Sequence, residues 1–552
     1  MKKVLIDFYN DIAKKKTFWI PLLIFVLSAY AFGMLNRTLS WDDLGRDKYV
    51  GEGNVTLAGR WGMDLWAKLT GTLDLNPFTD RYLAAFFLTI ASILACVVLY
   101  KLSSHNKVWP YTIVAASIIT YPLINEIWEY TMADYISCGN QCLVTLALLY
   151  LLCGEEGRKW KECIIASLLL LLPTSSYESA IFYYITFVSL VIFYKEYKLK
   201  EQYTFLKILK EGVVYCLPLV IAVALRFAIS FIINHVLGLS YNQGGATTLY
   251  WDFSDIFNSV KMLVLKSGFF YGIVGLVYFP ITVFVISMFA FIGVSVAGAV
   301  KKKRLGLIGL GALVLVAIFF QAIVQGDSMP YRTATLSLAL FVAFVSFLLC
   351  EASLGRKLMY LVTVTVLMLV CWHQSVYLNK IQSLNNLRSD NELAALRHMG
   401  YRLESEYDGS KPVVFVTSYT DGDWLKKRCT VSSKTWNGRL FLYITQSLMG
   451  GSAVAQDENG ESLFTDFKYI QSNLNCFTGY YTDIEAALSY LGFRVNILSP
   501  TTDESRPEYK IFEEALQIAQ KENMTPYSII ETDNYIIATL SNSSFFDKYG
   551  YQ

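Results

Sequence analysis

Long apolar segments recur along the first two thirds of the chain, and short polar connections separate them. Most are about 17 to 25 residues long, the length that a helix needs to cross a hydrocarbon core roughly 30 Å thick. The pattern predicts a polytopic α-helical membrane protein with about 11 transmembrane helices. We place these spans at residues 18–35, 82–100, 108–125, 139–153, 162–173, 178–194, 213–235, 272–296, 305–325, 333–350 and 357–376.

From about residue 380 the pattern changes to that of a soluble domain. We expect strands in "KPVVFVTS" and "FRVNILS", amphipathic helices in "DIEAALSYLG" and "PEYKIFEEALQIAQKE", and a closing hairpin in "YSIIETDNYIIATLS". Roughly 170 residues suffice for one small α/β domain. The chain thus divides into a transmembrane domain, residues 1–379, with a first outer loop at 36–81, and a C-terminal extracytoplasmic α/β domain, residues 380–552.

Composition and charge refine this architecture. The chain is 54% hydrophobic with a mean hydropathy of +0.40, above the level of ordinary soluble proteins. Its first span begins too late and lacks a small-residue cleavage site, so we expect an anchor rather than a signal peptide. Every second connection is rich in Lys and Arg, which predicts a cytoplasmic N-terminus and, with an odd number of spans, an outer C-terminal domain. These cations lie at 14–16, 101–107, 158–161, 195–210, 301–304 and 356–357.

Two adjacent carboxylates follow the first span, in "LSWDDLGRDKYV" at residues 39–50. Neighbouring side chains diverge by about 100° in a helix and point oppositely in a strand, so Asp42 and Asp43 do not address one substrate atom together. We interpret one as a general base that faces a cavity, and the other as a partner of Arg46 or of another part of the ligand. The alternative is a solvated pair at the membrane interface without a catalytic role.

The first outer loop also holds "TLAGRWGMDLWAKLTG" at residues 56–71. Its apolar positions share one broad half of a helix, and tryptophans flanked by cations are typical of a helix that lies in the membrane interface. Such a helix either shapes an entrance from the lipid or caps the bundle without a role in catalysis. The apolar positions are Leu57, Trp61, Leu65, Trp66 and Leu69, and the flanking cations are Arg60 and Lys68.

Charges also occur at the depth of the membrane or at its outer edge, where they are costly and usually face a cavity or a partner. Glu178 begins the sixth span, Arg226 lies within the seventh, and Arg332 precedes the tenth. Arg226 is either the structural partner of a carboxylate such as Glu178 or a clamp for a phosphate group.

The sequence contains no signature of a nucleotide site or of a metal site. A Gly-x-x-x-x-Gly-Lys phosphate loop is absent, and the four histidines are too far apart for a zinc site. We therefore expect no metal and no cofactor, although Asp42 and Asp43 could hold Mg²⁺ or Mn²⁺ if another carboxylate folded in beside them. Cys429 and Cys476 could form a disulfide in an oxidising space.

Taken together, these motifs resemble those of a known protein family. "WDDLGRDKYV" and "GRWGMDLW" in the first outer loop, with "YES" and "PYR" at later outer boundaries, resemble the bacterial Gtr type II glucosyltransferase family of the GT-C superfamily. The resemblance implies a multi-pass enzyme of the bacterial cytoplasmic membrane that moves one sugar, glucose by family default, from a polyprenyl-phosphate carrier to a cell-surface glycan such as O-antigen or teichoic acid. A polyprenyl-phosphate glycosyltransferase and a flippase would supply the donor. The large C-terminal domain departs from the O-antigen members, which leaves the acceptor open.

The resemblance also assigns roles to residues on the outer side. Asp42 becomes the candidate base and Asp43 the partner that positions the ligand, although a retaining route with Asp43 as nucleophile stays open. Candidates for the donor phosphate are Arg46, Arg60, Arg226 and Arg332. Candidates for the sugar or the acceptor are Trp61, Glu126, Glu129, Asp134, Tyr177 and Glu178.

Two other classes of function compete with this interpretation. A transporter or flippase for lipid-linked sugars would explain Arg226 and Glu178 equally well, but it does not need an acidic and aromatic first loop, and we find no repeat between two halves of the chain. A surface-assembly or sensor protein would not need 11 spans to anchor one outer domain.

Overall fold

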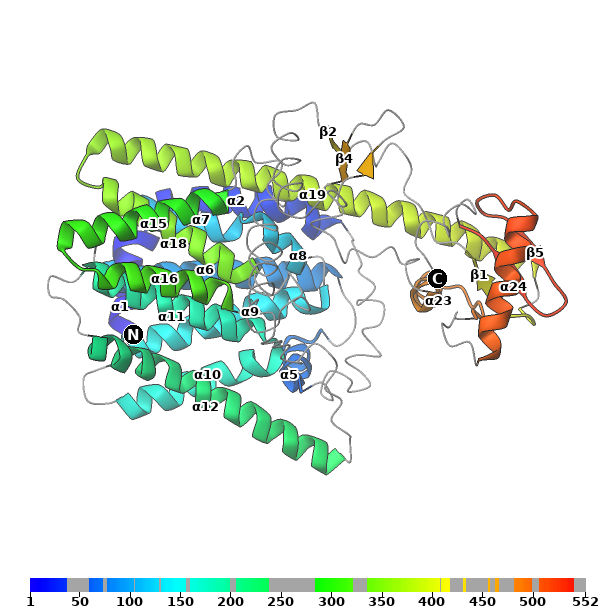
Figure 1. Ribbon diagram of the computed structural model, residues 1–552, viewed down its shortest axis with the longest axis horizontal. Coiled ribbons are helices and arrows are strands. Elements are labelled where there is room, and N and C mark those ends of the chain that lie inside the picture. Colours follow the sequence, from blue (N-terminus) through cyan, green and yellow to red (C-terminus); the bar gives the residue numbers. More distant parts are fainter. Residues whose placement is uncertain are drawn as a thin grey trace. The chain divides into compact units, whose positions relative to one another are not determined.

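The computed structural model describes most of the chain (Figure 1). The described residues are 1–36, 59–72, 77–103, 105–128, 131–154, 159–198, 205–237, 283–320, 335–407, 409–416, 430–432, 455–456, 462–465, 481–498 and 506–540. They fall into two compact units. The larger, called the membrane unit here, comprises Met1–Asn36, Asp47–Gln382 and Val431–Ile470, and the smaller, the C-terminal unit, comprises Arg37–Arg46, Ser383–Thr430 and Gln471–Gln552.

Helices make up nearly all of the described part of the membrane unit. They are α1 (Lys2–Phe8), α2 (Lys16–Leu35), α5 (Trp61–Thr70), α6 (Pro77–Ser103), α7 (Val108–Ile119), α8 (Asn125–Trp128), α9 (Thr131–Leu152), α10 (Lys159–Ser176), α11 (Ser179–Lys198), α12 (Phe205–Leu237), α15 (Val283–Lys302), α16 (Gly306–Ile318), α18 (Thr335–Ser353) and α19 (Lys357–Glu406).

Each predicted span overlaps one of these helices. Among the described residues, seven helices are long and apolar enough to cross a membrane, and α7 and α16 are shorter apolar helices. The fifth predicted span is part of a longer helix, α10, which extends to both sides of the predicted segment. The chain is therefore a multi-pass helical membrane protein, while the number of 11 spans stays a prediction.

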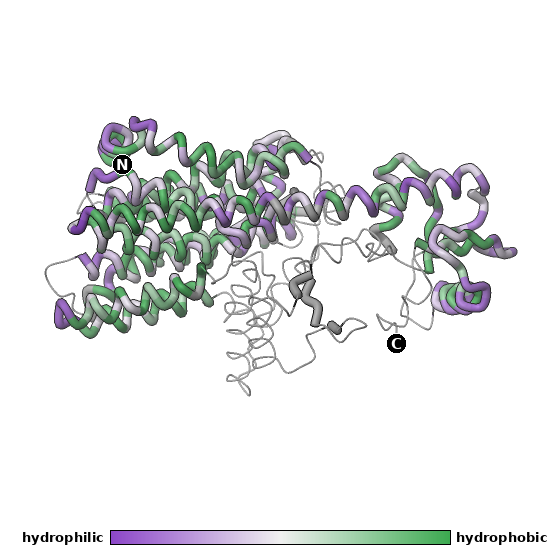
Figure 2. The backbone as a smooth tube through the Cα atoms, turned by 90° about the horizontal axis from the view of Figure 1, so that it is seen from above, coloured by the Kyte–Doolittle hydropathy of each residue, from purple (hydrophilic) through white to green (hydrophobic). Residues whose placement is uncertain are grey.

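Burial separates central helices from peripheral ones. The most apolar stretches of α11 and α18 are 83% buried inside the protein, whereas those of α12 and the first half of α19 are 28% and 33% buried. The peripheral helices expose large apolar side chains, such as Phe231 on α12 and Leu358 on α19. Figure 2 shows apolar residues along the bundled helices and hydrophilic residues at many of their ends. Such exposed apolar surface is expected where lipid covers a protein.

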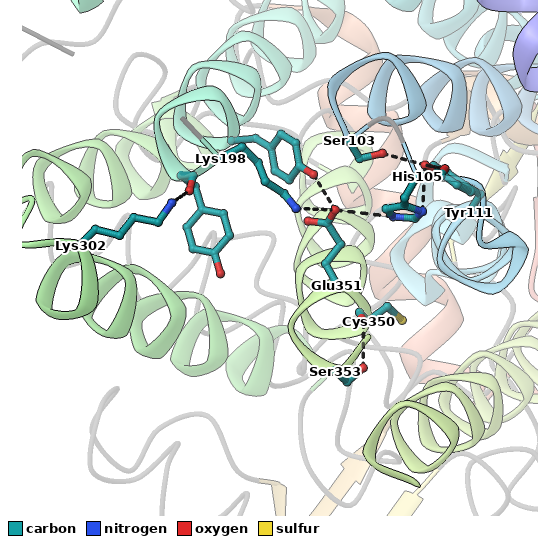
Figure 3. Close-up of polar contacts among 10 residues, drawn as sticks. Ser103, His105, Tyr111, Lys198, Lys302, Cys350, Glu351 and Ser353 are labelled. Carbon is teal, nitrogen blue, oxygen red and sulfur yellow. Dashed lines mark hydrogen bonds and ion pairs between the residues drawn. The ribbon is translucent and has the colours of Figure 1, made fainter. Parts of the chain in front are cut away.

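A partly buried polar cluster around Glu351 joins elements at one end of the bundle (Figure 3). Glu351 on α18 accepts a hydrogen bond from the Tyr194 hydroxyl at 2.7 Å and pairs with Lys198 Nζ at 3.0 Å, both on α11. His105, in the connection from α6 to α7, has its Nε2 3.6 Å from Glu351 Oε1. Lys198 and Glu351 thus hold the end of α11 against α18.

His105 gives this cluster a testable pH response. Burial and the charge of Lys198 lower its pKa from 6.5 to about 4, so the folded protein holds a neutral imidazole at pH 7. Between pH 6.5 and 4 the unfolded chain binds the extra proton, and stability is lost as the pH falls through this window. We expect the melting temperature of His105→Gln to fall less than that of wild type when the pH is lowered from 6.5 to 4. Scanning fluorimetry in detergent measures this difference. His235→Gln, on the exposed side of α12, is the control and should follow wild type.

The C-terminal unit contains a three-stranded sheet of order β1-β6-β5. β1 (Val413–Phe415) pairs in parallel with β6 (Ile536–Ala538), and β5 (Ile529–Glu531) pairs antiparallel with β6. The hairpin and the strand in "KPVVFVTS" are thus confirmed. The segment "FRVNILS" contributes only an isolated parallel bridge between Ile497 and Val413, rather than a full strand.

The two amphipathic helices that the sequence predicts are present as α23 (Tyr481–Tyr490) and α24 (Pro507–Lys521). The end of α19 also belongs to this unit, so one continuous helix crosses the boundary that the sequence placed between residues 379 and 380. α24 buries Phe512, Ala515 and Ala519, which lie three and four residues apart on one helix face. The other described strands, β2 (Thr430–Ser432), β3 (Ala455–Gln456) and β4 (Ser462–Thr465), form a second sheet of order β2-β4-β3, and β3 and β4 belong to the membrane unit. The extracytoplasmic location of the C-terminal part stays a prediction.

Candidate active site

Two arginines share one carboxylate in the membrane unit. Arg60 Nη2 lies 3.0 Å from Glu178 Oε2, and Arg226 Nη2 lies 2.8 Å from Glu178 Oε1. Arg60 Nε also donates to Oε1 at 3.4 Å, and its guanidinium carbon lies 5.2 Å from the centre of the Tyr177 ring. The structure thus brings together four residues that the sequence singled out, and we call the charged three the Arg60–Glu178–Arg226 triad.

The triad is positioned by three separate elements. Glu178 lies in the tight connection between α10 and α11, where the Tyr177 N–H donates to the carbonyl of Pro173 at 3.1 Å and the Ile181 N–H to that of Glu178 at 3.0 Å. Arg226 projects from α12, and Arg60 immediately precedes α5. Arg60 and Glu178 are 118 residues apart, so the site forms only if α5 docks correctly on the bundle.

α5 docks through glycines and one tryptophan. A Cβ atom on Gly62 would lie 2.5 Å from the hydroxyl oxygens of Ser175 and Ser176 on α10, so only glycine allows this approach. On the same helix the Trp66 indole N–H donates to Asn140 Oδ1 of α9 at 2.9 Å. A Cβ on Gly139 would meet the Trp66 ring at 3.0 Å. These contacts fix the helix that carries Arg60.

The buried face of α5 corrects the prediction for residues 56–71. The structure buries Gly62, Met63, Trp66 and Ala67 against the bundle, while Leu65 and Leu69 are exposed. The predicted broad apolar half of this helix is therefore divided between a protein contact and an outward surface. The contacts with small residues on α9 and α10 decide which side faces inward. Leu57 lies outside the described residues.

We expect Gly62→Ala to disturb this docking. The added methyl group has no space between α5 and α10, and such overpacking costs about 1–3 kcal/mol of stability. The melting temperature in detergent should fall, and any activity that needs Arg60 should fall with it. Gly212→Ala on α12 is the matched control, because nothing lies within 4 Å of its added Cβ, and it should leave both unchanged. A Gly62→Ala protein as stable and active as that control would contradict the docking model.

The electrostatics of the triad favour an anion. Two guanidinium groups face one carboxylate, and the Arg226 side chain is only 6% exposed. Burial raises the pKa of Glu178, but the charges of Arg60 and Arg226 outweigh this effect and hold the pKa at about 2. Glu178 therefore stays ionised at physiological pH and remains an ion-pair partner of both guanidinium groups. Planar guanidinium groups suit carboxylate and phosphate oxygens in particular.

Other sequence-predicted residues fall near this site or outside the described part. Trp61 is the first residue of α5, next to Arg60, and Asp134 is fully buried in the first turn of α9. Asp42, Asp43, Arg46, Glu129, Arg332, Cys429 and Cys476 lie outside the described residues, as does the side chain of Glu126.

Sequence reasoning missed a buried polar group at the base of the first outer loop. Arg81, in the first turns of α6, is 1% exposed and donates from Nη1 to the carbonyl of Gly33 at 3.4 Å. Gln382 Oε1 accepts from the Gly33 N–H at 3.2 Å, and a Cβ on Gly33 would lie 2.8 Å from Trp128 Nε1. These contacts hold the end of α2, from which the chain leads to Asp42. The charged "TDRY" directly before a predicted span was the available signal.

Metal ligands do not gather in the part of the chain that the structure describes. None of its His, Cys, Asp and Glu side chains form a group of three that could hold an ion. Asp42 and Asp43 lie outside the described residues, so this observation does not bear on a cation held by them and a third carboxylate.

Comparison with known proteins identifies the family. The model of the glucosyl transferase GtrII family matches residues 31–371, which include the end of α2, the first outer loop and the whole triad. The chain belongs to the glucosyl transferase GtrII family. With its apolar helices, this membership makes the GtrII protein a multi-pass membrane glycosyltransferase. The resemblance seen in the sequence is thereby confirmed. The match ends before Ser383, where the main part of the C-terminal unit begins.

Other comparisons add little for this GtrII protein. No curated protein matches the chain. Among solved structures, the archaeal oligosaccharyltransferase AglB from Archaeoglobus fulgidus, in complex with an inhibitory peptide and a dolichol-phosphate, is similar at 13% identity and a TM-score of 0.34. The alignment covers 73% of this chain and 62% of that one. A likeness of this degree supports no argument about fold or activity.

Proposed function

We propose that the protein transfers one sugar, glucose by family default, from a polyprenyl-phosphate carrier to a cell-surface glycan on the outer face of the bacterial cytoplasmic membrane. The observation that carries this proposal is the Arg60–Glu178–Arg226 triad, in which two guanidinium groups are fixed on one carboxylate within the family-matched segment. A donor made elsewhere in the membrane arrives already activated, so the enzyme needs no nucleotide site.

The triad suits the leaving group of this reaction. When the glycosidic bond to the carrier breaks, negative charge grows on the carrier phosphate, and fixed cations in a site of low dielectric stabilise that charge. Hydrogen bonds to Glu178 fix the positions of the Arg60 and Arg226 guanidinium groups. These side chains therefore need little rearrangement when the phosphate binds. Tyr177, beside Arg60, and Glu178 are candidates for contacts with the sugar hydroxyls.

The surface of α12 offers a route for the lipid part of the donor. Val220, Phe227 and Phe231 are all more than half exposed, and their spacing of seven and four residues places them on one face of the helix. Arg226 directly precedes Phe227, and its guanidinium carbon lies 5.8 Å from that ring. A polyprenyl chain against this face would bring its phosphate to Arg226.

The chemistry at the sugar needs a base on the acceptor side. The glycosyl carbon passes through an oxocarbenium-like transition state, and a carboxylate opposite the leaving phosphate accepts the proton of the attacking hydroxyl. Asp42 is our candidate for this base, with Asp43 and Arg46 orienting it or the ligand. This arrangement gives an in-line displacement with inversion.

Transfer in reconstituted membranes tests the proposal. Proteoliposomes containing the purified full chain and labelled polyprenyl-phosphate glucose are supplied with cell-envelope glycan on the face that carries the C-terminal unit. We expect label to appear in the glycan. If label crosses the bilayer on its carrier without entering any glycan, the protein is a flippase, a function that the charges of the triad would also serve.

A further inference from the structure

The C-terminal unit contains a cavity that the proposed chemistry of the membrane unit does not use. Its volume is about 310 Å³, at the lower end of the roughly 300–1,000 Å³ typical of sites for small ligands. The buried side chains of Leu403, Val413 and Ile536 contribute to its lining, so part of its wall is apolar.

Backbone hydrogen bonds between three segments hold this cavity in shape. The Val413 N–H donates to the carbonyl of Asn496 at 2.8 Å, and the Ile536 N–H donates to that of Pro412 at 2.9 Å. Because β1, β6 and the segment around Asn496 are joined in this way, the side chains that line the cavity project from a fixed frame. A pre-formed cavity orders few groups when a ligand enters.

The charges around the cavity are close to balanced. Lys411 Nζ is bound by Glu531 Oε1 at 2.6 Å and by the carbonyl of Thr532 at 2.7 Å, so its charge is already compensated. Glu404 Oε1 accepts the backbone N–H of Arg494 at 3.1 Å, which fixes this carboxylate beside the backbone of Arg494, a second charged residue of the lining. This balance disfavours a phosphate or another anion, because the carboxylate of Glu404 would repel it.

We infer that this cavity binds a neutral saccharide unit of the acceptor glycan, an inference that rests on the proposed function. A sugar hydroxyl both donates and accepts hydrogen bonds, so it matches a lining that offers the Glu404 carboxylate together with the Arg494 guanidinium and the Asn496 amide. Tyr407 and the apolar wall suit the C–H faces of a sugar ring. The family match ends at residue 371, so this acceptor site belongs to the part of the chain that the GtrII model does not cover.

Hydrogen–deuterium exchange of the full chain in lipid nanodiscs tests the site directly. The probes are methyl glycosides of glucose, galactose and N-acetylglucosamine, with inorganic phosphate as the anionic comparison. We expect at least one glycoside to slow exchange in peptides that cover residues 403–416 and 494–498. The double variant Arg494→Ala, Asn496→Ala should lose this protection, while Lys510→Ala on α24, which does not line the cavity, should retain it. Unchanged exchange with every glycoside, protection by phosphate alone, or equal protection in the double variant would overturn the inference.

A kinetic measurement separates this inference from the proposed function. With labelled donor, the double variant should raise KM for the acceptor glycan roughly tenfold, the effect of losing hydrogen bonds to a charged group, and leave kcat and KM for the donor unchanged. Equal acceptor KM in wild type and variant would refute the saccharide site and leave the transferase standing. Exchange protection by a glycoside in a protein that transfers no sugar would refute the transferase and leave the site standing.

Discussion

Replacing Asp42 by Asn is expected to lower the rate of sugar transfer by roughly 10²- to 10⁴-fold, the usual contribution of a general base. The amide has nearly the shape of the carboxylate but cannot take the proton of the attacking hydroxyl at neutral pH. The contacts of Gly33 with Arg81 and Gln382 hold the end of α2, from which the chain leads to Asp42, so a small isosteric change in the loop should leave the fold intact. The initial rate of label transfer measures the effect.

Neighbouring carboxylates provide the controls for this variant. Asp43→Asn should lower the rate less, because we assign Asp43 a positioning role, and Asp47→Asn should remain close to wild type. Full activity in both Asp42→Asn and Asp43→Asn would remove the catalytic assignment from this loop. A larger loss in Asp43→Asn than in Asp42→Asn would exchange the two roles, and a trapped glycosyl-enzyme on Asp43 would indicate a retaining route.

Arg226→Ala is expected to lower transfer by roughly 10²- to 10³-fold, as the loss of one fixed charge-stabilising donor does in other enzymes. The variant removes the more buried of the two arginines in the triad and leaves Arg60 as the ion-pair partner of Glu178. Arg226→Lys should recover only part of the rate, because a lysine keeps the charge but loses the planar fork that binds two oxygens of a phosphate. Transfer is measured per folded molecule, since a broken buried pair also destabilises the protein.

The opposite end of the bundle supplies a matched control. Arg304 Nη1 lies 3.6 Å from Glu196 Oε1, and both side chains are less than 10% exposed, so this buried pair resembles that of Arg226 with Glu178. Arg304→Ala should cost stability in a similar way and leave transfer per folded molecule unchanged. If the two arginine variants lose the same activity per folded molecule, Arg226 acts through stability and does not bind the donor phosphate.

Glu178 reconciles the two interpretations that the sequence left open for Arg226. The ion pair is present, at 2.8 Å, and Arg60 places a second guanidinium group on the same carboxylate, so a structural pair and a cluster of cations occur at one site. Since the guanidinium groups hold the pKa of Glu178 at about 2, its titration lies below the range in which the enzyme works. Any loss of transfer between pH 7 and 4 should therefore come from another group, for which Asp42 is our candidate.

The sequence by itself determined that the chain is a multi-pass helical protein, and it determined most of the local elements of the C-terminal unit. Span length is set by bilayer thickness, so apolar segments such as those of α2 and α18 could be recognised without knowledge of their neighbours. The same holds for the hairpin of β5 and β6 and for the amphipathic α24, whose periodicity is visible in a single segment. Family membership likewise follows from short motifs along the chain.

Only the tertiary structure decided which distant residues meet. It joined Arg60 to Glu178 across 118 residues, turned Met63 and Ala67 of α5 inward rather than Leu65 and Leu69, and formed a partly open cavity between segments that the sequence treats separately. The physical reason is that these outcomes depend on close packing, such as that of Gly62 against α10, and packing is a property of pairs of surfaces. Hydrophobic periodicity describes one surface at a time and does not specify its partner.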